Sequence, residues 1–192
     1  GRFGVGLVAG MNTLSLAQVS MLMGALGIAA SLWQALAPDR VRRMLDALPR
    51  HTLAGWALAA VDLLWVAWLI NETNLGRFDA WKPALYFLTP LSFYLLIQYL
   101  DELLAVRALG GFLLLVAAPV LDIARWHTSD WRLVIAGLAY LWVVIGMALV
   151  MSPHLFRRSV RFFLPDDARG RLSATLKLLV SAGLIALGLL VF

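Results

Sequence analysis

Apolar residues gather into six long runs along this chain, and short polar segments separate one run from the next. The runs cover residues 14–37, 51–70, 83–101, 103–124, 132–151 and 172–192. Each would form about 25–35 Å of helix at 1.5 Å per residue, which matches the hydrocarbon core of a bilayer. The pattern predicts an all-α fold: a polytopic transmembrane helix bundle of about six spans, forming a single membrane domain over residues 1–192.

The third and fourth runs contain residues that disturb helices. Pro83 suits a helix start, whereas Pro90 and Pro119 fall inside their runs, where each removes a backbone donor and is expected to bend the helix. We expect the pair Gly110-Gly111 to kink the fourth run or to shorten it. The first run has a different alternative, because Ala35-Leu36-Ala37 resembles the small-residue cleavage site of a signal peptide.

The distribution of basic residues favours six spans over five. With six spans and both ends outside, ten of the sixteen Lys and Arg residues fall in the inner loops and five in the outer segments. A five-span arrangement places one strongly basic loop outside, against the positive-inside rule. Trp68, Trp81, Trp126 and Trp131 all fall at the expected outer boundary, where an amphipathic indole prefers the headgroup zone. We therefore expect a multi-pass protein with cytoplasmic basic loops.

Two of the basic loops repeat one pattern. Residues 38–43 and 153–158 both have the form P-x-x-x-R-R at an offset of 115, and Leu48-Pro49 matches Leu164-Pro165 after one inserted residue. An apolar run precedes and follows each copy. The sequence thus predicts two parallel helix–basic loop–helix repeats, at about 14–70 and 132–192, which flank a central hairpin at about 83–124.

Each repeat unit resembles a family of short two-helix bacterial inner-membrane proteins of unknown function. The order of elements in that family is an apolar helix, a proline, a basic stretch, a Leu-Pro pair and a second helix. The resemblance covers about residues 20–70 and 135–192 and leaves the third and fourth runs unexplained. It implies a bacterial origin and a location in the cell inner (cytoplasmic) membrane, and it implies no activity.

Composition restricts the class of protein further. Hydrophobic residues make up 62% of the chain and charged residues 14%, and the mean hydropathy is +0.85. These values exclude a disordered chain, a nucleic-acid-binding domain and an ordinary soluble enzyme. The chain has no cysteine, which excludes a disulfide framework and a thiolate metal site.

The net charge of +5 is best explained by membrane lipids, because the arginines cluster between apolar runs. We expect apolar residues beside these arginines to dip toward the acyl chains. They are Met44, Leu45 and Leu48 in the first loop, or Val160, Phe162 and Phe163 in the second. The alternative is that the arginines only set the direction of insertion. The candidate contacts to anionic headgroups are Arg42, Arg43, Arg157, Arg158 and Arg161.

Ionisable residues inside the runs are the main candidates for chemistry, because they are costly in a bilayer and often functional. Asp62 lies deep in the second run and Lys177 lies near the start of the sixth. In the repeat alignment they occupy nearly the same place, at Pro49+13 and Pro165+12. We therefore predict an ion pair between the two copies. The alternative for Asp62 is a structural polar contact between helices.

Weaker polar candidates lie near the ends of the central runs. Gln98, Asp101 and Glu102, with Arg107, fall at the inner end of the third and fourth runs and suggest a gate for cations. The alternative is a solvated turn with a Glu102–Arg107 pair. Asp122 lies near the outer end of the fourth run, where the same alternative applies. Small residues at Gly27 and Ser31, and at Ala182 and Ala186, predict close helix approach.

No catalytic constellation is found in the sequence. The three histidines stand apart at loop boundaries, which predicts neither a metal site nor a haem site, and no cofactor is expected. We therefore expect a non-enzymatic accessory, packing or assembly component of a membrane complex. Its expected partners are lipids and a membrane protein or a second copy, and not nucleic acid. The alternative is a small-solute or ion transporter that uses Asp62.

Overall fold

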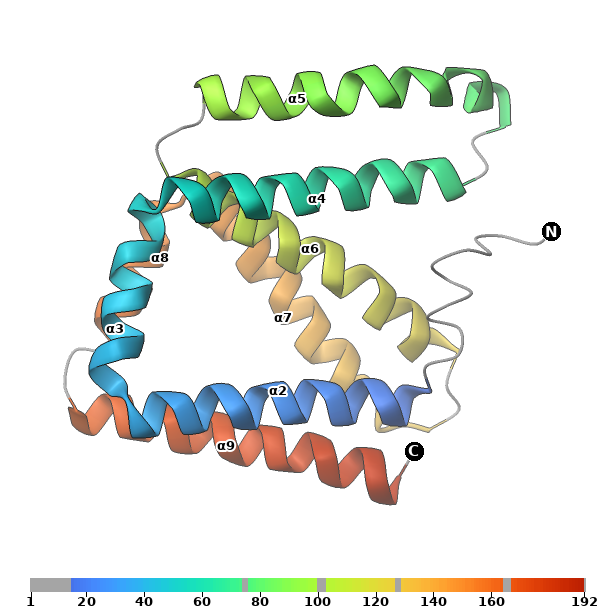
Figure 1. Ribbon diagram of the computed structural model, residues 1–192. Coiled ribbons are helices and arrows are strands. Elements are labelled where there is room, and N and C mark those ends of the chain that lie inside the picture. The colour runs from blue at the N-terminus through green and yellow to red at the C-terminus, as the bar shows by residue number, and fades with distance from the viewer. Residues whose placement is uncertain (1–14, 74–75, 100–102, 127–128, 164–166, 192) are drawn as a thin grey trace.

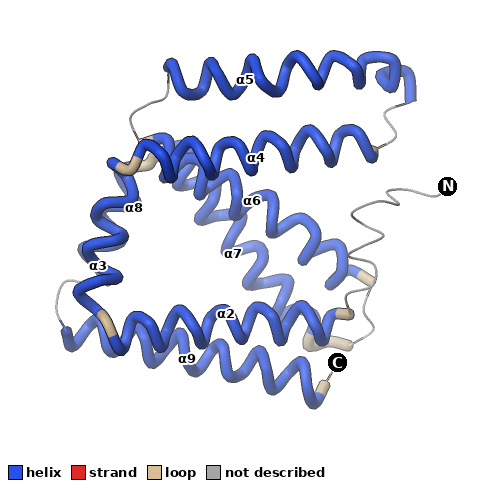
Figure 2. Tube along the Cα trace, in the orientation of Figure 1, coloured by secondary structure: helices blue, strands red, loops and turns tan. Residues whose placement is uncertain are grey.

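The computed structural model describes residues 15–73, 76–99, 103–126, 129–163 and 167–191. Within them, each apolar run corresponds to one long helix. These helices are α2 (Leu16–Leu36), α4 (Thr52–Glu72), α5 (Leu85–Tyr99), α6 (Leu104–Arg125), α7 (Arg132–Met151) and α9 (Asp167–Leu190). Two shorter helices, α3 (Pro38–Ala47) and α8 (His154–Phe163), and two 3₁₀ segments, η1 (Leu48–Arg50) and η2 (Gly76–Ala84), join them (Figure 1). Figure 2 shows only helix and short loops over the described residues.

Five helices in the described part of the chain are long and apolar enough to cross a membrane. They are α2, α4, α6, α7 and residues 170–190 of α9. The predicted class of a multi-pass helical membrane protein is confirmed to this extent. The α5 helix has fifteen residues, or about 22 Å at 1.5 Å per residue, and is shorter than a full bilayer crossing.

The long helices pack in two antiparallel pairs, α2 with α9 and α6 with α7, while α4 runs parallel to α6. In Figure 1 the two pairs converge at one end of the molecule and diverge toward the other. The convergent end is held by a buried cluster from several helices that includes Leu16, Val120, Ile135 and Leu184. At the divergent end α3 and α8 contact each other and lie across the gap between the pairs.

Glycines bring the paired helices close together. A β-carbon placed on Gly24 of α2 would lie 2.7 Å from the Ser181 carbonyl oxygen, and one on Gly27 would overlap the Ser181 hydroxyl. The predicted approach at Gly27 and Ser31 is thus confirmed, since Ser31 is also buried. The prediction for Ala182 and Ala186 is wrong, because both are exposed and α9 packs through the face that carries Ser181 and Gly188.

The pair Gly110-Gly111 has a different role from the one expected. The α6 helix runs without interruption from Leu104 to Arg125, so the predicted shortening is wrong and the kink stays a prediction. A β-carbon on Gly110 would lie 2.7 Å from the Gly146 carbonyl oxygen, and one on Gly146 would lie 2.8 Å from that of Gly110. These two glycines therefore allow the backbones of α6 and α7 to touch.

Gly146→Ala is expected to destabilise the protein by about 1–3 kcal/mol, because the new methyl group meets backbone that cannot move aside. Gly137, on the same helix, has nothing within 4 Å of a β-carbon. Gly137→Ala is therefore the matched control, and its higher helix propensity predicts equal or greater stability. Unfolding in mixed micelles, followed by circular dichroism, compares the two. Equal losses would contradict the close α6–α7 contact.

Candidate functional site

Asp62 lies between α4 and α6, and a glycine makes room for its side chain. Gly55 and Ala59 precede it on the face of α4 that packs against α6. A β-carbon on Gly111 of α6 would lie 2.9 Å from Asp62 Oδ2. One turn further along α4, Trp65 meets Phe112 edge to face, with ring centroids 6.0 Å apart. A carboxyl group is thus held inside an otherwise apolar helix interface.

Two charged side chains of α4 and α6 have buried atoms without a hydrogen-bond partner. Among the described residues these atoms are Asp62 Oδ1 and Arg107 Nε. Arg107 precedes Gly111 by one turn along α6. A buried polar atom without a partner costs folding free energy. Asp62 therefore contributes little to stability as placed, which makes it the leading candidate for a functional role.

The predicted ion pair between Asp62 and Lys177 is wrong. Lys177 lies on α9, where its Nζ donates to Gln34 Oε1 of α2 at 2.9 Å. Gln34 Nε2 in turn donates to Ser173 Oγ at 2.6 Å and to the Gly170 carbonyl oxygen at 3.0 Å. Gln34 is only 5% exposed, so this network joins the α2–α9 pair from within. Lys177 is thus a structural contact between those two helices.

The remaining polar candidates are dispersed. Gln98 is exposed on α5, and Asp101 and Glu102 lie outside the described residues, so the predicted gate stays a prediction. Asp122 is exposed near the end of α6 and, with Arg125 and Arg132, lines a cavity of about 430 Å³ between α6 and α7. These groups form no common centre with Asp62.

The candidate lipid contacts lie on α3 and α8. The side chains of Arg42, Arg43, Arg157 and Arg158 are exposed there, while that of Arg161 lies outside the described residues. Of the six residues expected to dip into the lipid, Met44 is 52% exposed, and the side chains of Phe162 and Phe163 lie outside the described residues. The expectation is wrong for Leu45, Leu48 and Val160. They pack on a buried cluster that joins α8 to α6 and α7 through Phe156, Val106 and Leu149. These three side chains are thus used within the protein, whereas the four described arginines are exposed.

Sequence reasoning missed three features of these contacts. Gln34 stands in the first apolar run and carries the same signal as Gln98, so a search for every polar residue in the runs finds it. The role of Gly111 has no such signal, because it depends on which helix faces Asp62. His51, considered only as a ligand, instead accepts a hydrogen bond from the Ala54 amide through Nδ1 and caps α4.

Comparison with protein-family models, with curated protein sequences and with solved structures found no match to this chain. The resemblance to two-helix inner-membrane proteins therefore stays a prediction. Function must be argued from the geometry of the helices and their polar groups.

Asp62→Ala is expected to leave stability unchanged or to raise it, because the carboxyl group it removes has a buried oxygen without a partner. Gln34→Leu is the comparison and should cost about 1–3 kcal/mol, since it leaves Lys177 Nζ without its acceptor, Gln34 Oε1. Both are measured by unfolding in mixed micelles. A loss for Asp62→Ala as large as that for Gln34→Leu would show that Asp62 is a structural contact.

Proposed function

We propose that this protein is a non-enzymatic component of a bacterial cytoplasmic membrane complex, which it supports by lateral contact within the bilayer. The observation that carries the proposal is the packing of α5. This helix contributes no buried residue, whereas every other long helix buries side chains within the protein. It rests mainly on α4, so its outer face is open to a partner.

The outer face of α5 combines apolar and polar side chains. Phe87, Leu91, Tyr94 and Gln98 recur at helical spacing, and the first three are 70%, 40% and 62% exposed. A tyrosine hydroxyl and a glutamine amide facing hydrocarbon would lack partners, and such groups form hydrogen bonds between membrane helices. We call these four residues the α5 stripe, and we assign it the contact with a partner's membrane helix.

The same proposal includes six membrane crossings. The α4 helix starts beside α3, and α6 starts at that same end because Gly55 lies against Ala105. The chain must therefore return along the molecule between Glu72 and Leu104, and α5 runs back alongside α4 (Figure 1). Together with η2, which precedes it, α5 is the additional crossing that brings the five candidate spans to six. The arginines of α3 and α8 then face the cytosol, in accordance with the positive-inside rule.

The duplication is the structural basis that we infer for this arrangement. A long helix, a ten-residue basic helix and a second long helix follow one another in α2–α3–α4 and again in α7–α8–α9. The helix contacts are not the same for equivalent helices of the two copies. The first helix of copy one, α2, packs on the last helix of copy two, α9, whereas α6 packs against both α4 and α7. In this proposal the central hairpin of α5 and α6 entered between two ancestral units.

The topology can be tested with single cysteines, because the chain has no native cysteine. Three exposed positions are suitable: Asp46 of α3, Ser159 of α8 and Ala80 of η2. We expect a membrane-impermeant maleimide to label Asp46→Cys and Ser159→Cys only from the cytoplasmic side, in inverted vesicles. Ala80→Cys should react only from the opposite side, in spheroplasts. Labelling of Asp46→Cys and Ser159→Cys from opposite sides would refute the six-span arrangement.

A photoreactive amino acid at Leu91 or Tyr94 is expected to crosslink a membrane protein in native membranes, since these positions face outward on the α5 stripe. Leu179 of α9, which is 67% exposed, is the control position and should give no protein adduct. Paired Tyr94→Ala and Gln98→Leu substitutions should reduce stoichiometric co-purification severalfold, and Leu179→Ala should not. An adduct with the mass of two chains identifies the partner as a second copy. Equal adducts at Leu91 and Leu179 would contradict the proposal.

A second candidate function is transport of an ion or small solute through the Asp62 site. The observation that favours it is the pair of buried, unpartnered atoms, Asp62 Oδ1 and Arg107 Nε. The cavities described between α4 and α5 and between α6 and α7 are lined by other residues. Ion flux in proteoliposomes that Asp62→Ala abolishes, while α5 stripe variants keep it, would favour transport over the accessory role.

A further inference from the structure

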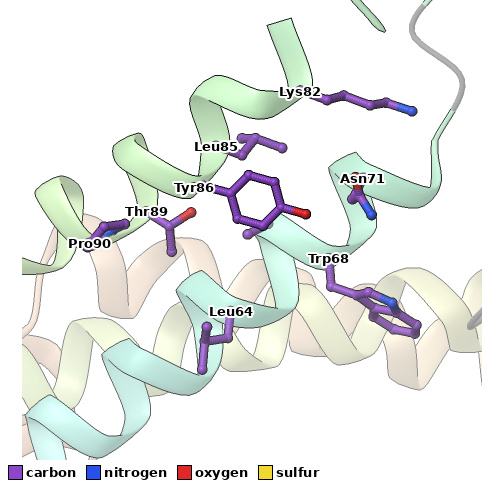
Figure 3. Close-up of a pocket in the computed structure, with 9 residues that line it drawn as sticks. Leu64, Trp68, Asn71, Lys82, Leu85, Tyr86, Thr89 and Pro90 are labelled. Carbon is purple, nitrogen blue, oxygen red and sulfur yellow. The ribbon is translucent and has the colours of Figure 1, made fainter.

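A groove separates α5 from α4 over much of their length. Its first part is a cavity of about 360 Å³, lined on α4 by residues from Leu64 to Asn71 and on η2 and α5 by residues from Lys82 to Pro90 (Figure 3). Its second part, of about 250 Å³, continues to Ala60 and Phe93. The two parts share Leu64, Thr89 and Pro90, so they form one continuous groove, which we call the α4–α5 groove.

The sequences of the two helices explain why the groove exists. The α5 helix has neither glycine nor alanine, so its backbone cannot approach α4 as closely as α2 approaches α9. Across from it, the α4 wall includes the small residues Ala60 and Ala67. The groove opens sideways, because Leu64 and Tyr86 line it and are still 64% and 81% exposed. Any molecule in the surrounding bilayer therefore has direct access to it.

The dimensions of the groove fit one acyl chain. From Ala60 to Asn71 it extends about 16 Å along α4 at 1.5 Å per residue. One leaflet contributes about half of the 30 Å hydrocarbon core, or about 15 Å. A helix with its side chains is about 10–12 Å across, which is too wide for a space of this volume. A protein partner is thus excluded from the groove, though it remains able to contact the outer face of α5.

Polarity along the groove matches the polarity of a phospholipid. The walls near Ala60 and Phe93 are apolar, while Asn71 and Lys82 lie together at the other end, and the Tyr86 hydroxyl points toward Asn71 (Figure 3). Lys82 Nζ lies 3.0 Å from Asp79 Oδ1, and its remaining donors can bind phosphate. The cationic and anionic groups of this pair complement the phosphate and ammonium of a zwitterionic headgroup.

We propose that the α4–α5 groove binds one acyl chain of a bilayer phospholipid, with the headgroup phosphate beside Lys82 and Asn71. The bound lipid belongs to the leaflet remote from α3 and α8. It fills the space between α4 and α5 and holds α5 in place. This site is separate from the basic surface of α3 and α8 and from the α5 stripe.

The test uses purified protein in vesicles of phosphatidylethanolamine and phosphatidylglycerol that contain a trace of phosphatidylethanolamine with a diazirine on its acyl chain. Photolysis and peptide mass spectrometry then locate the adducts. We expect severalfold more adduct at Leu64 and Phe93 than at Val144 of α7, which is 58% exposed and reports ordinary surrounding lipid. The enrichment should disappear when the probe is a diazirine diacylglycerol, which has no phosphate. It should also disappear when the phospholipid probe is used with the Lys82→Gln protein.

Ala67→Phe fills the groove and should reduce the adduct at Leu64 and Phe93 to the level at Val144. The matched control is Ala57→Phe, which adds the same ring at an exposed position of the same helix. Equal yields at Leu64 and Val144, or enrichment that survives Ala67→Phe, would overturn the proposal. Because no partner protein is present in these vesicles, the result is independent of the proposed accessory function.

Discussion

Close contact between helix backbones is the constraint on which this architecture depends. Within a bilayer, apolar side chains gain little by leaving lipid for one another, so helices associate through tight packing and interhelical hydrogen bonds. Gly24 and Gly27 allow this for α2 and α9, and Gly110 with Gly146 allows it for α6 and α7. These two pairs make the most extensive helix–helix contacts in the described part of the chain. The shorter helices α3 and α8 then set how far the pairs diverge at the basic end.

Helix positions could be predicted from the sequence because they depend on local properties. Length of an apolar run and the polar residues that end it are sufficient, and each of the six runs contains a long helix. Contacts between helices depend on rotation about each axis, which the repeat alignment does not contain. That alignment placed Asp62 and Lys177 at similar depth, yet Lys177 reaches Gln34 and Asp62 faces Gly111. The position of each residue along its helix could be inferred, whereas the identity of its neighbour could not.

The candidate sites differ in how visible they were in the sequence. Asp62 was found because a carboxyl group in an apolar run is costly and therefore conspicuous. The absence of a partner for its Oδ1 is a property of the α4–α6 interface and appears only in the structure. The α4–α5 groove had no sequence signal of its own. It arises because bulky α5 residues face small α4 residues, and that pairing is visible only after the two helices are placed side by side.

The packing of α5 differs from that of the α2–α9 and α6–α7 pairs, and this difference links the α4–α5 groove to the α5 stripe. Helices that touch through glycine gain contact along their whole length, and their separation exposes buried groups such as Gln34 to lipid. The α5 helix has no such contact and no buried residue, so moving it away from α4 costs little. A helix held this weakly needs another molecule to fix its position. In our two proposals, lipid in the groove supplies contacts on one side of α5 and a partner helix on the stripe supplies them on the other, so both address the same deficit in packing.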